Sequence, residues 1–151
     1  MILKAILILA QVWSNIKYTD TYKKTNMLSQ TNTEIPAEKL YDLSMIEMLC
    51  RGDQEKVKKM VKVFIDQIPQ SVEEIKSAYN KKDFVIIKHV AHRIKPTLSY
   101  YAIVKIEKDV KLIEAMAEEG LATTELELKI KRLEEVATQV VEKMKKDFLY
   151  S

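Results

Sequence analysis

Apolar residues recur at helical spacing along the chain from residue 40 onward. They repeat at alternating steps of three and four, which places them on one face of a helix. The pattern predicts a short first helix after Pro36 and four longer helices behind it. The apolar stripes are Leu43, Ile46 and Leu49; Val57, Met60, Val61, Phe64, Ile68, Val72, Ile75 and Tyr79; Phe84, Ile87, Ala91, Ile94, Leu98 and Tyr101; Ile103, Ile106, Val110, Ile113 and Ala117; and Leu126, Ile130, Leu133, Ala137, Val140 and Met144.

Turn and capping residues separate these stripes. Gly52 is a stop for the first helix, and Asp53 and Asp83 stand where an acidic side chain caps the next one. Gly120 is a second glycine stop. Four amphipathic helices with short connections predict an all-α fold, an antiparallel four-helix bundle with an additional short N-terminal helix.

Two prolines fall inside predicted helices. Pro69 removes the amide bond to the Ile65 carbonyl, so we expect a kink there. Pro96 removes the bond to the His92 carbonyl and disfavours helical geometry at Lys95. A bend or break required by packing and an adjusted presentation of the His92 ring are both open for Pro96.

The sequence predicts two regions, an N-terminal extension over residues 1–39 and one helical domain over residues 40–151. A chain of 151 residues with 47% hydrophobic content supports one core. Residues 1–10 are apolar but too short for a membrane-spanning helix. Three interpretations stay open for them: a secretion signal, an appended packing segment, or a translation start placed upstream of a true start near Met27.

Composition argues against several function classes. The net charge of +3 comes from interspersed charges, and the absence of a basic stripe weighs against nucleic-acid binding. Cys50 is the only cysteine, which excludes an intrachain disulfide and a cysteine-based metal site and favours the cytoplasm. Two glycines cannot build a phosphate-binding loop, so the chain is no conventional kinase.

His92 is the candidate for chemistry. It lies about 135° from the centre of its helix's apolar stripe and so faces solvent, with Lys88 and Lys95 at offsets of minus four and plus three. A neutral imidazole can attack a phosphoryl group, and Lys95, with Lys88 as a second candidate, would neutralise the phosphoryl oxygens. An exposed histidine among lysines is also compatible with an ordinary surface.

His89 competes with His92, since it also points away from the stripe. His92 has the compact Pro96 at plus four, whereas His89 has His92 and Arg93 at plus three and plus four, which crowd its ring. A metal pair is disfavoured because no carboxylate or third histidine shares this face nearby.

The run Ala91-His92-Arg93-Ile94-Lys95-Pro96-Thr97-Leu98 resembles the active-site helix of histidine-containing phosphotransfer (HPt) domains, roughly Ala-His-x-Leu-Lys-Gly-Ser. The resemblance covers about residues 40 to 148. It implies that His92 is phosphorylated on a ring nitrogen, that Lys95 assists electrostatically, and that the chain relays phosphate without being an independent enzyme. Ile94 replaces the common Leu, and Pro96 replaces the common Gly.

The resemblance also implies partners. Phosphate would come from, or pass to, an aspartate on receiver domains of hybrid histidine kinases or response regulators, which carry the magnesium ion; the chain itself has no cofactor. We expect a monomer, away from the membrane, whose docking surface has Tyr100 or Ile103 at its rim. The alternative is a non-catalytic helical module that binds a protein without carrying phosphate.

Overall fold

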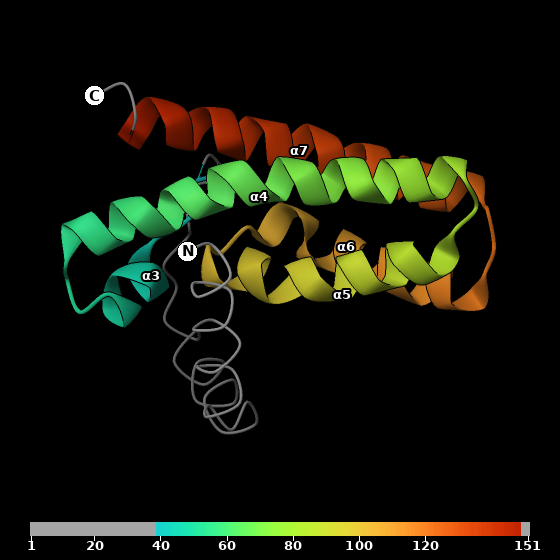
Figure 1. Ribbon diagram of the computed structural model, residues 1–151, viewed down its shortest axis with the longest axis horizontal. Helices are drawn as coiled ribbons and strands as arrows, with labels where there is room; N and C mark the ends of the chain where they lie inside the picture. Colours follow the sequence, from blue (N-terminus) through green and yellow to red (C-terminus); the bar gives the residue numbers. More distant parts are fainter. Residues whose placement is uncertain (1–38, 149–151) are drawn as a thin grey trace. The chain divides into compact units, whose positions relative to one another are not determined.

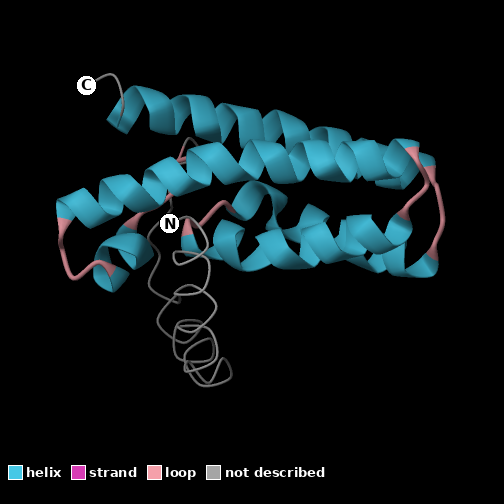
Figure 2. Ribbon diagram, viewed as in Figure 1, coloured by secondary structure: helices cyan, strands magenta, loops and turns pink. Residues whose placement is uncertain are grey.

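The computed structural model describes residues 39–148, and within this range every regular element is a helix (Figures 1 and 2). The helices are α3 (Ser44–Leu49), α4 (Gln54–Asn80), α5 (Phe84–Tyr100), α6 (Val104–Glu119) and α7 (Thr124–Phe148). The predicted all-α class and the order of one short and four long helices are confirmed. Residues 1–38, on which the three interpretations of the N-terminal extension depend, lie outside the described residues.

Each of the four long helices packs against two of the others. α4 contacts α5 and α7, α6 contacts the same two helices, and the short α3 packs on α4. Consecutive long helices run in opposite directions, as the colours in Figure 1 show. Their inward faces share one apolar cluster, in which the rings of Phe64 and Tyr101 lie 4.6 Å apart between centroids. The Tyr101 hydroxyl donates to the Met60 carbonyl at 2.8 Å, so its polar end is satisfied inside the core.

The predicted helix boundaries are confirmed by their caps. Asp53 accepts hydrogen bonds from the backbone amides of Glu55 and Lys56 at 3.1 and 3.2 Å, which satisfies the first turn of α4. Asp83 accepts from the amide of Ile86 at 3.1 Å at the start of α5. Gly120 ends α6 with φ of 69°, a left-handed geometry that glycine adopts without steric cost.

Both internal prolines are accommodated inside continuous helices. α4 runs through Pro69 and α5 runs through Pro96 to Tyr100, so neither proline ends its helix. The break that one interpretation of Pro96 allowed is therefore wrong, while a bend at Pro96 and the kink expected at Pro69 stay predictions. Packing against neighbouring helices maintains the helical path on both sides of each ring.

In the part of the chain that is described, no helix combines the length and the apolar character required to cross a bilayer.

Candidate functional site

His92 stands on the exposed side of α5 and leans toward α6. Its side chain is 67% exposed, which confirms the prediction that it faces solvent. α5 and α6 are joined by a short turn that ends at Ile103, and they pack against each other in opposite directions. His92 lies 11 positions before Ile103, and Glu114 lies 11 positions after it. The helical hairpin therefore brings position 114 opposite position 92.

One carboxylate connects the two residues predicted to act at this site. Nδ1 of His92 lies 2.6 Å from Oε1 of Glu114. The Lys95 ammonium forms an ion pair with Oε2 of the same carboxylate. The Glu114 side chain is only 16% exposed, although it lies on the outer side of the helical hairpin. His92, Lys95 and Glu114 form a cluster, which we name the histidine–glutamate–lysine triad.

The charge state of Glu114 decides which nitrogen of His92 is available. Partial burial raises the pKa of Glu114, but the hydrogen bonds from Lys95 and His92 outweigh it, so the net pKa lies below its ordinary value. An ionised carboxylate can only accept hydrogen bonds, so the proton must be on Nδ1 of His92. The lone pair of the neutral ring is then on Nε2, which does not contact Glu114.

Lys88, the second predicted assisting cation, lies one turn before His92 and has its own partner. Its ammonium bonds Oε1 of Glu118 at 2.7 Å. The same hairpin relation explains this pair, because residues 88 and 118 lie 15 positions on either side of Ile103. Lys88 therefore borders the triad without contacting its carboxylate.

His89 differs from His92 in its surroundings. It is exposed on α5, one turn earlier, and no hydrogen bond or ion pair to its ring is found among residues 39–148. Nothing in the described structure fixes its tautomer or its ring orientation. The preference for His92, first argued from crowding, thus rests on the carboxylate partner that only His92 possesses.

Two further expectations concern the rim of the site and metal binding. Ile103 is 1% exposed, so the prediction that it is a rim contact is wrong; it precedes the first residue of α6 and its side chain is in the core. Tyr100 is partly exposed at the end of α5. Across residues 39–148, no group of three or more His, Cys, Asp or Glu side chains is placed to hold a metal ion.

Glu114 is the site residue that the sequence interpretation missed. Its neighbours Ile113 and Ala117 were assigned to the apolar stripe of the helix, but Glu114 itself received no role. The sequence could have indicated it, because positions equally distant from a turn lie opposite each other in a helical hairpin. A turn centred near Ile103 places residue 114 opposite residue 92. Using it requires knowing that α5 and α6 are direct neighbours, which the stripes alone do not establish.

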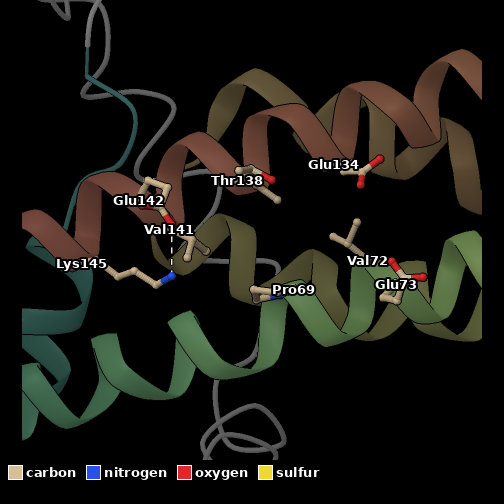
Figure 3. Close-up of a pocket in the computed structure, with 9 residues that line it drawn as sticks. Pro69, Val72, Glu73, Glu134, Thr138, Val141, Glu142 and Lys145 are labelled. Carbon is tan, nitrogen blue, oxygen red and sulfur yellow. Dashed lines mark hydrogen bonds and ion pairs between the residues drawn. The ribbon is translucent and has the colours of Figure 1, made fainter.

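A shallow groove of about 280 Å³ lies between α4 and α7, away from the triad (Figure 3). Pro69, Val72 and Val141 are among its apolar lining residues. Lys145 bonds Glu142 at 3.0 Å within the lining, as the dashed line in Figure 3 shows, whereas Glu73 and Glu134 pair with Lys76 outside it. None of the triad residues lines this groove, so it is separate from the candidate site.

No protein-family model matches the chain, and neither a curated protein nor a solved structure matches it.

Proposed function

We propose that this region is an antiparallel four-helix bundle that acts as a histidine phosphotransfer domain in the cytoplasm. His92 accepts a phosphoryl group from an aspartate of one receiver domain and passes it to an aspartate of another. The observation that carries this proposal is the contact between Nδ1 of His92 and Glu114, which leaves Nε2 as an exposed nucleophile. The motif around His92 supports the same assignment through its resemblance to the HPt active-site helix.

The reaction can be written in terms of the triad. The lone pair on Nε2 of His92 attacks the phosphorus of an aspartyl phosphate, and the bond between phosphorus and the aspartate oxygen breaks, with its electron pair leaving on the receiver's carboxylate. The proton on Nδ1 stays in its contact with Glu114, so the positive charge that develops on the ring faces a carboxylate. Onward transfer reverses these steps at the second receiver.

The chain's own contribution is positioning and charge. Glu114 fixes the ring by a 2.6 Å contact, and α5 holds Lys95 one turn beyond the histidine. The magnesium ion, held by the receiver, would neutralise phosphoryl oxygens from the partner's side. In this proposal the protein is a monomer that relays phosphate, with no cofactor of its own and no independent enzyme activity.

The departure from the HPt pattern at Pro96 is compatible with this proposal. α5 continues as a helix through Pro96, and His92 keeps its contact with α6. Proline also lacks a long side chain that would cover the ring, so a receiver can approach Nε2. Pro96 has no amide hydrogen to donate to the His92 carbonyl, as a residue four positions on would in a regular helix.

The test is phosphorylation of matched histidine variants. The wild-type chain, His92→Gln and His89→Gln are each incubated with a phosphorylated receiver and magnesium, and acid-labile, base-stable phosphate on the chain is measured. We expect label on the wild-type chain and on His89→Gln, and a loss of at least about a hundredfold in His92→Gln, as for removal of a nucleophile. Circular dichroism of each variant checks that the helices are retained.

Two outcomes would contradict the proposal. Label that persists in His92→Gln and disappears in His89→Gln would move the acceptor to His89. If no receiver of the organism's full set labels the wild-type chain, the alternative of a non-catalytic helical interaction module is favoured, and binding to receivers without transfer would then be the activity to measure.

A further inference from the structure

Lys95 and His92 share the carboxylate of Glu114, and this sharing has a consequence for the phosphorylated state. Lys95 lies at plus three from His92 on α5, yet its ammonium is held by Oε2 of Glu114. Its side chain is 28% exposed, whereas His92 is 67% exposed. Before phosphorylation, the assisting charge is thus committed to the Nδ1 side of the ring.

Phosphorylation changes the balance of charge around Lys95. A phosphoryl group on Nε2 adds close to two negative charges and three acceptor oxygens within a few ångströms of the ring. Glu114 offers only one negative charge, and it retains a second partner in the protonated Nδ1. The phosphoryl group and Glu114 are then two acidic groups beside a single ammonium, so they compete for Lys95.

We propose that Lys95 exchanges partners, bound to Glu114 when His92 is unmodified and to the phosphoryl group when His92 is phosphorylated. This inference rests on the proposed function. Glu114 then has two separable effects: it orients His92, and it withholds Lys95 from the phosphoryl group. The second effect lowers the stability of the phosphorylated state by competition and so favours onward transfer.

The neighbouring cations described within residues 39–148 are held by carboxylates other than Glu114. Lys88 is engaged by Glu118 and Arg93 by Glu74, both at less than 3 Å, so each neighbouring cation has a carboxylate outside the triad. The Lys95 ammonium reaches the phosphoryl side by rotation of its flexible side chain alone, without movement of α5. The exchange is therefore a side-chain event, which nuclear magnetic resonance can follow.

The direct test observes the Lys95 side-chain nitrogen in the full chain. Phosphoramidate serves as a small phosphoryl donor: its phosphorus–nitrogen bond breaks, Nε2 of His92 forms the new bond, and ammonia leaves. We compare the ¹⁵Nζ signal of Lys95 in the wild type and in Glu114→Gln, before and after phosphorylation. We expect Glu114→Gln to shift this signal clearly in the unmodified protein and to have little effect once ³¹P spectra show phosphohistidine.

A kinetic cycle gives an independent readout. Lys95→Met is made in the wild type and in Glu114→Gln, and phosphorylation rates with phosphoramidate are measured. We expect Lys95→Met to slow the reaction about two- to fivefold more in the Glu114→Gln background, within the range of one solvent-accessible charge pair. The effect of Glu114 on the ring itself cancels in this comparison. Glu107→Gln, which removes a carboxylate paired with Lys111 at 3.1 Å on the same helix, is the control background and should give no extra slowing.

Failures of the two proposals are distinguishable. If ³¹P spectra show no phosphohistidine in the wild type and His92→Gln behaves identically, the proposed function fails. If phosphohistidine forms on His92 but the Lys95 signal keeps its dependence on Glu114, the exchange is wrong while the function stands. An equal effect of Lys95→Met in all three backgrounds would also overturn the exchange.

Discussion

At the scale of single residues, several helix ends use left-handed backbone geometry without glycine. Arg51, Lys82 and Ala102 have φ values of 52°, 57° and 50°. Each residue directly follows the C-cap of a helix, where a left-handed residue reverses the chain, and its amide donates to a carbonyl near the helix end. A residue with a Cβ is strained in this region by about 1–2 kcal/mol. These ends therefore contain strain that glycine would remove.

Ala102→Gly should stabilise the protein by about 0.5 kcal/mol. The relief of strain, about 1–2 kcal/mol, exceeds the extra entropy that glycine loses on folding, about 0.5–1 kcal/mol. Urea denaturation followed by circular dichroism measures the change. Ala122→Gly, in the connection between α6 and α7, is the matched control because Ala122 has no positive φ; it should be neutral or destabilising. A loss of stability in Ala102→Gly equal to that of the control would contradict the strain argument.

The sequence predicted well whether a helical side chain faces solvent, but it did not predict which side chain that residue contacts. The exposure of His92 followed from its angle to the apolar stripe, since that angle depends only on helix geometry. The role of Glu114 did not follow, because a side chain's partner depends on which helix lies beside it and on how that helix is rotated. Placing Ile103 at the rim went against its own position at the start of an apolar stripe, which indicates the buried side chain that the structure has.

At the scale of elements, α6 and α7 are joined by a buried charge. The side chain of Asp109 is 7% exposed and contacts two cations of α7, Lys129 at 2.8 Å and Arg132 at 3.1 Å. The stripe of α6 contains only apolar residues in the sequence pattern, so this acid was not anticipated. A buried carboxylate is tolerated only when it is paired, and here both partners come from the neighbouring helix.

Asp109→Ala should destabilise the protein by about 2 kcal/mol. This is less than the 3–5 kcal/mol typical when one partner of a fully buried pair is removed, because the two cations keep access to solvent. The measurement is the free energy of unfolding in urea. Glu107→Ala, on the same helix with an ion pair to Lys111 at the surface, should cost less than about 1 kcal/mol. Equal losses in the two variants would show that the buried position of Asp109 does not matter.

Element boundaries were predicted well because their signals are local. Asp53, Asp83 and Gly120 each act on the adjacent turn, so the chain alone reveals them. The prolines were harder, since Pro96 is unfavourable for an isolated helix and yet stands inside α5. Packing of the apolar face of α5 against α4 and α6 outweighs that local preference.

At the scale of the whole molecule, stability should fall with acid because several carboxylates are stabilised in the folded state. The hydrogen bond from Lys39 lowers the pKa of Asp42 to about 2. The pKa of Asp147 is also lowered, chiefly by its hydrogen bond from Lys143. For Glu114, burial raises the pKa, but the bonds from Lys95 and His92 bring it below 4.5. A lowered folded-state pKa means that the unfolded chain binds protons first, so these contributions are present above the unfolded pKa and are lost as pH falls through the folded pKa.

The triad predicts that the effect of Glu114→Gln on the free energy of unfolding changes sign when His92 and Lys95 are removed. In the wild type, Glu114→Gln should make the fall of unfolding free energy below pH 4.5 shallower, because one group with a lowered pKa is removed. In the double variant His92→Ala, Lys95→Met, the two bonds that lower the pKa are gone and burial alone acts on Glu114, which raises its pKa above the ordinary value. Its charge then opposes folding at neutral pH, so adding Glu114→Gln there should stabilise the protein. Urea titrations from pH 3 to pH 7 measure the free energy of unfolding of the wild type, of the double variant, and of each with Glu114→Gln added. A Glu114→Gln change of the same sign in the two backgrounds would show that His92 and Lys95 do not keep this carboxylate ionised.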